Sequence, residues 1–271
     1  MSEVLGIDVS HHQGKIAWDK VATSGKNFAI LKAMYEAKSH NKDDFFEANY
    51  KGAGDYGIDR GVYIYIARAS MENPVGDAKA LLKHLNGRKL EYGIWLDLED
   101  NNLRAKGKEY IRNLCYIYAY HFTMAGYFVG IYSNRDWYLN VIHDDLKNDF
   151  DFWIARYPAN DNGTYNPMST LKPASTYAVA WQYSSKGNVP GINGKCDLDV
   201  DYDGITKLDY HMSYKITVEK IALEVLAGKW GNGPERKEKL KAAGYDYKEV
   251  QQKVNELLQN HLDRNNSNKV T

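Results

Sequence analysis

Two carboxylates two residues apart, Asp97 and Glu99, lie at the polar end of the apolar segment 92–101, YGIWLDLEDN. If this segment is a strand, its side chains alternate, and the two acids share one face with Trp95. Two acids that are partly removed from water repel each other, so one of them keeps its proton near neutral pH. A neutral acid beside an ionised one is the pair that cleavage of a glycosidic bond requires.

Further acids lie in the first and the last of the segments that resemble strands. Asp8 ends the first, in GIDVSHHQG, and Asp197 begins a run of alternating acids in the last, CDLDVD. In a closed barrel the first and last strands are neighbours, so we expect Asp8 and Asp197 to converge on Asp97 and Glu99. The alternative is that the acids only cap loops or pair with basic residues that follow other strands (Lys32, Arg68 and Arg156).

The elements that would position these acids alternate along the chain. Short apolar or alternating segments predict strands at 4–9, 28–34, 61–66, 92–99, 127–133, 152–156, 177–183 and 196–201. Helical patterns separate the first six strands, at 16–23, 44–56, 75–85, 105–124 and 137–148, whereas loops rich in Gly, Pro and Asn separate the last three. This order predicts an α/β fold, an irregular TIM-like barrel with a parallel sheet and chemistry at the C-terminal ends of its strands.

Composition excludes several functional classes. The 271 residues carry a net charge of zero, which argues against nucleic acid as a partner. The longest apolar runs are far shorter than the roughly 20 residues of a membrane span, so we predict no membrane insertion. The start, MSEVLGIDVS, has no secretory pattern, which predicts synthesis and retention in a cytoplasm. The 22 Tyr and 6 Trp weakly favour a carbohydrate ligand, because aromatic faces stack on sugar rings.

No metal or other cofactor is predicted. The two cysteines, Cys115 and Cys196, have no metal-ligand spacing and form no disulfide framework. The segment from Asp199 to Gly204, with acids at every second position, resembles the opening of a calcium loop. The twelfth position of such a loop requires a bidentate Glu, and here it is Tyr210.

Blocks of sequence follow one another over residues 4 to about 205, reading GIDVSHHQG, NFAILKA, GVYIY, IWLDLED, GIYSN, FWIARY, AWQYS and CDLDVDYDG. In order and spacing they resemble glycoside hydrolase family 25, the Chalaropsis-type lysozymes. The resemblance implies an irregular barrel of five strand–helix units and three more strands. It also implies hydrolysis of the β-1,4 bond between N-acetylmuramic acid and N-acetylglucosamine in bacterial peptidoglycan.

The resemblance also assigns roles to positions of this chain. It implies that Glu99 is the general acid, Asp97 its partner, and Asp8 and Asp197 the remaining carboxylates of the site. The residues implied to line the substrate groove are Tyr63, Tyr132, Trp181 and Gln182. The chain departs from the family at Ile64, where many members have His, and at Cys196–Asp199, where Val-Asp-Leu-Asn is commoner. The role of Asp97 stays open between nucleophile, general base and orientation of the acetamido group of the substrate.

The pattern changes after Gly204, which divides the chain into a catalytic domain (1–206), a linker (207–217), a three-helix module (218–258) and a polar tail (259–271). Apolar residues from Val218 to Leu226 form an amphipathic stripe that Gly228 ends. Helices are also expected from Pro234 to 243 and from 247 to about 258.

The segment IALEVLAGKWGNGPERKEKLKAAGYDYKEVQQKVNELL, within residues 218–258, resembles the CW-seven cell-wall-binding repeat. This resemblance implies muropeptide binding. We predict that the Gly-rich loop and the helix after it bind the wall through Trp230, Asn232 and Arg236. The alternative is that Trp230 fills the small core of the module. Self-association of the module would raise the avidity of a single weak site.

An enzyme with a wall-binding module and no export signal is typical of a bacteriophage endolysin. Such a protein accumulates in the cytoplasm of the host until its release, and then acts on the cell wall. The alternatives are a bacterial autolysin, a hexosaminidase that cleaves on the other side of each sugar, and a wall-binding lectin without activity. Internal initiation at Met212 would produce a free binding module.

Overall fold

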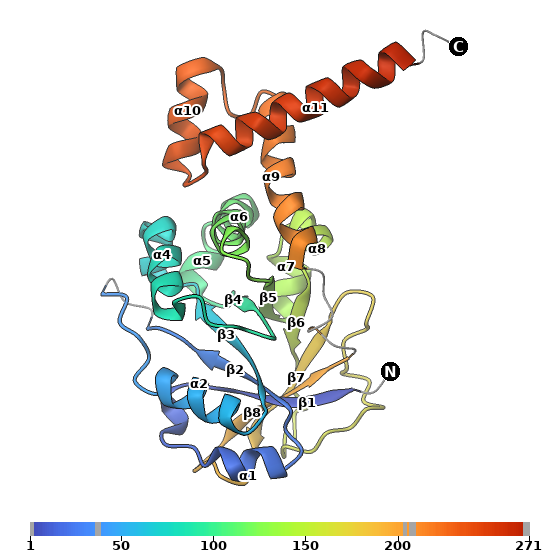
Figure 1. The fold of residues 1–271 in the computed structure, drawn as a ribbon. Coiled ribbons are helices and arrows are strands. Elements are labelled where there is room, and N and C mark those ends of the chain that lie inside the picture. Colours follow the sequence, from blue (N-terminus) through green and yellow to red (C-terminus); the bar gives the residue numbers. More distant parts are fainter. Residues whose placement is uncertain (1–2, 36–38, 203–204, 206–209, 268–271) are drawn as a thin grey trace.

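In the described part of the chain, eight strands close into a barrel in the order of the chain, and helices cover the side formed by β1 to β6, whereas loops flank β7 and β8 (Figure 1). The computed structural model describes residues 3–35, 39–202, 205 and 210–267. The strands are β1 (Val4–Val9), β2 (Phe28–Lys32), β3 (Asp59–Tyr65), β4 (Ile94–Asp97), β5 (Val129–Asn134), β6 (Phe152–Ala155), β7 (Ala180–Gly187) and β8 (Cys196–Asp201). The predicted irregular TIM-like barrel, followed by a small set of helices, is confirmed.

Helices connect the strands and extend the chain beyond the barrel. Those of the barrel region are η1 (His11–Gln13), α1 (Trp18–Thr23), α2 (Phe46–Asp55), α3 (Arg68–Glu72), α4 (Pro74–Leu85), α5 (Asn101–Arg104), α6 (Lys108–Met124), α7 (Arg135–Asn140) and α8 (Asp144–Asp149). The C-terminal helices are α9 (Tyr210–Leu226), α10 (Gly233–Ala242) and α11 (Tyr247–Ser267). No helix of the described residues has the length and apolar character that crossing a membrane requires.

The helix predicted over 137–148 is two helices. Asn134 caps α7 by accepting a hydrogen bond from the amide of Trp137, and the side chain of His143 accepts one from the amide of Asp145 at the start of α8. The second cap interrupts the helical hydrogen bonding that the apolar pattern predicted. The one-turn elements η1, α3 and α5 were not predicted, because a single turn has no apolar period.

The last strand departs from the predicted parallel sheet. Strands β1 to β7 are parallel, whereas β8 is antiparallel to both of its neighbours, β7 and β1. The segment 188–195 between β7 and β8 is too short for the crossover that a parallel neighbour needs. As a result the first residues of β8, and not its last, lie at the C-terminal ends of the other strands.

Alternation along β4 divides its side chains between two apolar layers. Trp95 lies inside the barrel with Phe28 and Tyr92, whereas Ile94 and Leu96 pack outward against the helices. The Trp95 indole donates a hydrogen bond to the carbonyl of Tyr92 (2.8 Å). Gly130 on β5 makes room for this ring, because a Cβ there would lie 2.3 Å from Trp95 Cζ3. The interior below the strand ends is therefore a packed aromatic core.

The C-terminal helices are longer than predicted. Residues 206–209 of the chain lie outside the described part, but α9 begins at Tyr210, inside the predicted linker 207–217. Helix α11 continues to Ser267 through most of the predicted polar tail, whose residues 268–271 are not described. Both extensions lack Gly and Pro, so nothing in their backbone interrupts a helix. Gly228, with φ +80°, ends the α9 region as predicted.

Candidate active site

A cavity of about 240 Å³ opens at the C-terminal ends of the barrel strands. The four predicted acids line it together with three of the four predicted groove residues and two further aromatic residues: Asp8, Asp97, Glu99, Asp197, Tyr63, Tyr132, Gln182, Trp153 and Tyr157. The structure therefore brings together carboxylates that are up to 189 positions apart in the chain.

Strand register explains how the acids meet. Asp8 on β1 is the direct partner of Asp197 on antiparallel β8, and Asp97 is the partner of Tyr132 on β5. Glu99 lies two residues beyond the end of β4, in the turn that leads to α5. Asp100 caps α5 by accepting hydrogen bonds from the amides of Asn102 and Leu103, and this cap sets the direction of the chain immediately after Glu99.

The carboxylates differ in exposure and in affinity for protons. Asp8 and Asp97 are buried, Asp197 is half-buried, and Glu99 is exposed at the rim. Desolvation by the cavity walls raises the pKa of Glu99 above its ordinary value. Burial, and then the charge of Glu99, raise the pKa of Asp197 to about 6. The site therefore binds protons more tightly than isolated carboxylates do, as acid catalysis near neutral pH requires.

A chain of hydrogen bonds holds Asp8 in place. The hydroxyl groups of Tyr132 and Tyr157 both donate to Gln182 Oε1, the first at 2.8 Å. The amide of Gln182 in turn donates to Asp8 Oδ2 at 2.5 Å. Because the amide oxygen accepts both phenols, its nitrogen must face Asp8, which fixes the orientation of the side chain.

Trp181 does not line the cavity, and its prediction as a groove residue is corrected by the structure. It precedes Gln182 on β7 and therefore points to the opposite face of the strand. Its side chain is 2% exposed, packs near Tyr165 and Tyr183 outside the barrel, and donates to the carbonyl of Arg156 (2.9 Å). The family block AWQYS had suggested both residues, but alternation allows only one of them to face the site.

Trp153 and Tyr157 line the cavity and were not predicted. Trp153 packs against Tyr132 with ring centroids 4.5 Å apart, and its indole forms part of the cavity wall. Tyr157 is more exposed and stands at the rim. Alternation along β6 could have identified Trp153. Phe152 and Ile154 belong to the outer apolar layer, so Trp153 between them points into the barrel.

Within the described residues, no three His, Cys, Asp or Glu side chains are grouped as ligands of a metal ion. Residues 203 and 204 of the calcium-like pattern lie outside the described part of the chain. The chemistry available in the cavity is proton transfer and charge stabilisation by carboxyl groups beside aromatic and amide side chains.

The residues predicted to bind the cell wall lie on and beside the loop before α10. Trp230 donates to Glu224 Oε2 (3.1 Å) and meets the edge of Tyr245, with ring centroids 5.6 Å apart. It packs against the core of the C-terminal helices, as in the alternative prediction. Asn232 is exposed, and its Oδ1 accepts a hydrogen bond from Arg236 (3.2 Å).

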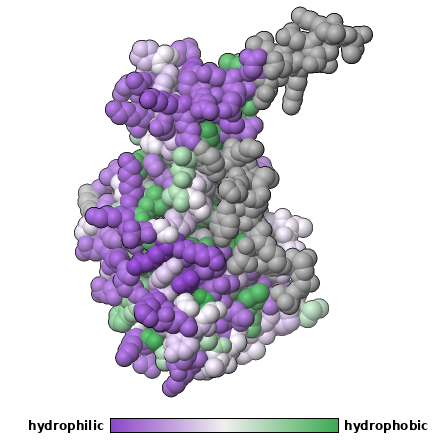
Figure 2. Space-filling view, in the orientation of Figure 1, coloured by the Kyte–Doolittle hydropathy of each residue, from purple (hydrophilic) through white to green (hydrophobic). Residues whose placement is uncertain are grey.

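Arg236 also joins the loop to α11. Its guanidinium donates to the carbonyl of Gly231 (3.1 Å) and to Gln251 Oε1 (3.1 Å). Asn232 and Arg236 therefore form one polar group at the surface, while Trp230 supports it from below. On the face seen in Figure 2, the coloured surface around α10 is largely hydrophilic.

The barrel contributes to the core of the C-terminal helices. Tyr120 of α6 is 4% exposed and lies in a cluster with apolar residues of α9, α10 and α11. Its hydroxyl accepts a hydrogen bond from the amide of Asp246 (2.8 Å) and donates to Glu249 Oε2 (2.9 Å). These bonds hold the first turn of α11 against α6. The helical module is therefore attached to the barrel by contacts as well as by the chain.

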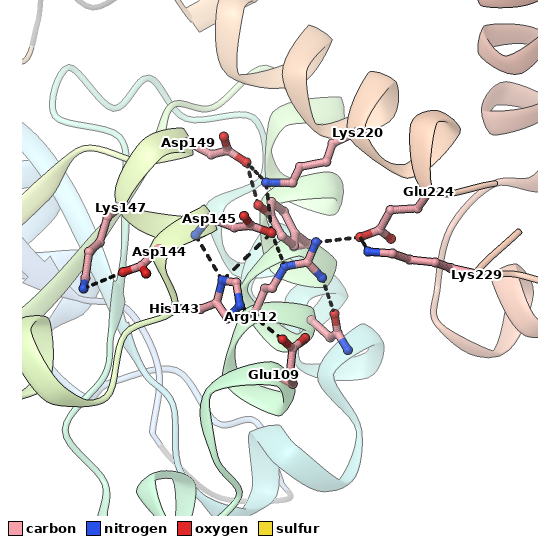
Figure 3. Close-up of polar contacts among 12 residues, drawn as sticks. Glu109, Arg112, His143, Asp144, Asp145, Lys147, Asp149, Lys220, Glu224 and Lys229 are labelled. Atoms are coloured by element: carbon pink, nitrogen blue, oxygen red, sulfur yellow. Dashed lines mark hydrogen bonds and ion pairs between the residues drawn. The ribbon is translucent and has the colours of Figure 1, made fainter. Parts of the chain in front are cut away.

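Ion pairs extend this interface between α6, α8 and α9 (Figure 3). Arg112 of α6 donates to Glu224 of α9 (2.5 Å) and to Asp145 of α8 (2.6 Å). Lys220 of α9 contacts Asp149 and lies 3.5 Å from Asp145. Arg112 is buried in this arrangement, and its planar guanidinium joins two carboxylates from different helices.

Comparison with known proteins gives two family matches. The model of glycosyl hydrolases family 25 matches residues 7–192, and that of the CW_7 repeat matches residues 219–258. Lysozyme M1 of Streptomyces globisporus is 30% identical over 207 residues, which cover 72% of this chain and 67% of that protein. The lysozyme of Streptococcus phage Cp-7 is 34% identical over 139 residues, covering 49% of this chain and 37% of that protein.

The fold is also similar to solved structures. The crystal structure of the bacterial lysozyme from Streptomyces coelicolor superposes with a TM-score of 0.61 and 26% identity. The superposition covers 79% of this chain and 99% of that chain.

Proposed function

Because the chain belongs to glycosyl hydrolases family 25, we propose that it is an N-acetylmuramidase, cleaving the β-1,4 bond between N-acetylmuramic acid and N-acetylglucosamine in peptidoglycan. Membership of the family makes the chain a glycoside hydrolase. The observation that carries the finer proposal is the gathering of Asp8, Asp97, Glu99 and Asp197 in one cavity at the barrel mouth.

Glu99 is the general acid in this proposal. The group that protonates a leaving glycosidic oxygen must hold a proton at the working pH and still reach the substrate. Glu99 meets both conditions, since desolvation raises its pKa and it stands at the rim of the cavity.

Asp97 has a different role from Glu99 in this proposal. It is buried at the end of β4, on the same face as Glu99, and lines the same cavity. We assign it to orienting or polarising the acetamido group of the substrate, which then assists the departure of the leaving sugar. Asp8 and Asp197 set the local field and accept hydrogen bonds from sugar hydroxyls.

Identification of the reducing ends released from purified peptidoglycan tests this function. A muramidase leaves N-acetylmuramic acid at each new reducing end, and mass spectrometry after borohydride reduction identifies that sugar. New ends of N-acetylglucosamine would instead make the protein a hexosaminidase. Wall binding without any new reducing end would make it a lectin and overturn the proposal.

The C-terminal module is proposed to bind the cell wall through Asn232 and Arg236, with Trp230 as their structural support. The match to the CW_7 repeat and the exposed polar group at the loop support this assignment. Attachment to the barrel links this surface to the catalytic domain, and the raised effective concentration compensates for a weak single site. Self-association of the module is a second source of avidity, and sedimentation of the full chain over a range of concentrations tests it.

Replacing both Asn232 and Arg236 by Ala is expected to weaken binding to purified walls by about tenfold, because hydrogen bonds from a charged group are lost. Pull-down with insoluble walls measures the affinity in a Glu99→Gln background, where the wall stays intact. Lys237→Ala, an exposed change in the same helix, serves as the control. Equal binding of the double variant and the control would remove these residues from the site.

The biological role that we propose is that of a phage endolysin, which resides in the host cytoplasm and then acts on the cell wall. Similarity to the phage Cp-7 lysozyme and the wall-binding repeat support it. Cells that express the chain in the cytoplasm are expected to grow until their membrane is permeabilised, and then to lyse. Lysis without permeabilisation would favour an exported autolysin.

A further inference from the structure

Asp199 lies inside the barrel, beneath the cavity. On β8 it is two residues beyond Asp197, on the same face, and it pairs with Gly6 of β1 and Gln182 of β7. Its side chain is 0% exposed and does not line the cavity. It is therefore a carboxyl group that substrate does not reach, although it adjoins one that does.

The contacts of Asp199 are too few for an ionised carboxylate. Its Oδ1 accepts a hydrogen bond from the indole of Trp153 (2.9 Å). Its Oδ2 is buried and has no hydrogen-bond donor among the described residues. An ionised carboxylate has about four acceptor sites, and leaving most of them empty in the interior is costly.

Asp8 is an acidic neighbour of Asp199 on the adjacent strand, two residues after its partner Gly6. The carboxyl groups of Asp8 and Asp199 lie within hydrogen-bonding reach of each other, a contact that requires a proton between them. Within the described residues, the other titratable groups that interact electrostatically with the pair come from several elements, and Lys26 is the cation among them: Asp97 on β4, Tyr132 on β5, Tyr157 after β6, Tyr183 on β7, Cys196 and Asp197 on β8, and Lys26 before β2.

We propose that Asp199 is a positioning residue of the reaction: it shares one proton with Asp8, so that the two carboxyl groups carry one negative charge between them. Asp8 is then held from two sides, by the amide of Gln182 and by the carboxyl group of Asp199. The same side chain anchors Trp153, whose ring is part of the cavity wall. The role in catalysis rests on the proposed function, whereas the shared proton does not.

A shared proton makes the stability of the folded protein depend on pH. Burial, and then the neighbouring Asp197, raise the pKa of Asp199 well above its ordinary value. A carboxyl group whose pKa is higher in the folded than in the unfolded chain binds more protons when folded. The free energy of unfolding therefore falls as the pH rises from about 4 towards the raised pKa.

The test compares three variants of the full chain. Asp199→Asn keeps the shape, accepts from Trp153 and offers an amide hydrogen to Asp8, so it imitates the protonated form. Asp199→Leu removes both the donor and the acceptor. Asp19→Asn, an exposed change in α1, is the control. Activity, thermal stability from pH 5 to pH 8, and the infrared band of protonated carboxyl groups are measured.

Asp199→Asn is expected to keep kcat within about threefold of the parent, and Asp199→Leu to lower it by at least about tenfold, because a displaced catalytic group loses much of its effect. The Tm of Asp199→Asn should exceed that of the parent by a margin that widens from pH 5 to pH 8. An infrared band of a protonated carboxyl group at neutral pH should be lost in Asp199→Asn and kept in Asp19→Asn.

Different outcomes separate the proposal from the proposed function. An Asn variant as inactive as the Leu variant would show that Asp199 acts as an anion. A constant Tm margin, or an unchanged infrared band, would show that it carries no proton. If the chain has no muramidase activity, the Tm and infrared measurements still test the shared proton, independently of the proposed function. They also test it if Asp199→Leu does not fold, because they rely on Asp199→Asn.

Discussion

Glu99→Gln is expected to lower kcat on purified peptidoglycan by about 10³-fold or more, with little change in affinity for the wall. A positioned general acid contributes about 10²–10⁴-fold to such a reaction, and the amide of Gln has no proton that it can transfer. Gln has almost the same shape as Glu, and the exposed position of Glu99 at the rim makes the folded state tolerant of the change. Initial rates of reducing-end release measure the effect.

The matched control is Glu238→Gln, the same change at an exposed position of α10. It should leave both kcat and wall binding unchanged. An activity of Glu99→Gln within a few-fold of that control would remove Glu99 from the reaction. Loss of wall binding together with activity would instead indicate misfolding, which circular dichroism and the Tm of the variant distinguish.

The pH dependence of the parent enzyme provides an internal check on the same assignment. The acid must be protonated to act, so activity falls as the pH rises through the pKa of Glu99. Desolvation raises that pKa, and the alkaline limb of kcat/KM is therefore expected above the ordinary pKa of Glu, about 4.3. A limb at or below that value would contradict the role of Glu99.

Arg112→Ala is expected to lower the free energy that holds the C-terminal helices on the barrel by about 3–5 kcal/mol, the usual cost of removing one partner from a buried ion pair. Glu224 is only 11% exposed in its side chain and would keep Lys229, 3.6 Å away, and the indole of Trp230. Asp145 is more exposed and would keep Lys220 at 3.5 Å. Glu224 is the more buried of the two carboxylates, so the loss of its nearest cation dominates the effect.

Hydrogen exchange of α9 to α11 and thermal unfolding measure this effect. Faster exchange is expected in these helices, with little change in the strands of the barrel. Arg104→Ala is the matched control, because Arg104 forms an exposed ion pair with Asp136 (2.6 Å), and water screens such a pair so that it contributes little to stability. Equal effects of the two changes would mean that the interface does not stabilise the module.

Local pattern was sufficient to predict much of the catalytic region. Alternation along 92–99 placed Trp95, Asp97 and Glu99 on one face; in the structure Trp95 lies inside the barrel and both acids border the cavity. The order of strands and helices predicted the barrel. These inferences succeeded because side-chain alternation and the apolar period act over a few residues, within one element.

Predictions about the surroundings of these residues were less complete. The block AWQYS suggested both Trp181 and Gln182 as groove residues, and the pleat of β7 sends Trp181 outward. Tyr157 reaches the site from a loop, where no period applies. The linker was predicted from the change of pattern between Gly204 and the amphipathic stripe that starts at Val218, whereas α9 already includes Tyr210 because its sequence contains no helix-breaking residue.

The amino-acid sequence by itself determined the elements of this protein and the acids that each element carries, since these depend on neighbours along the chain. The sequence named Asp197 as the acid of β8 that meets Asp8, but only the tertiary structure decided that Asp199 is buried beneath the cavity. That outcome depends on the antiparallel direction and register of β8. The tertiary structure also decided that Tyr120 of the barrel completes the core of the C-terminal helices. Such contacts join residues far apart in sequence, and their energies depend on burial that no local pattern specifies.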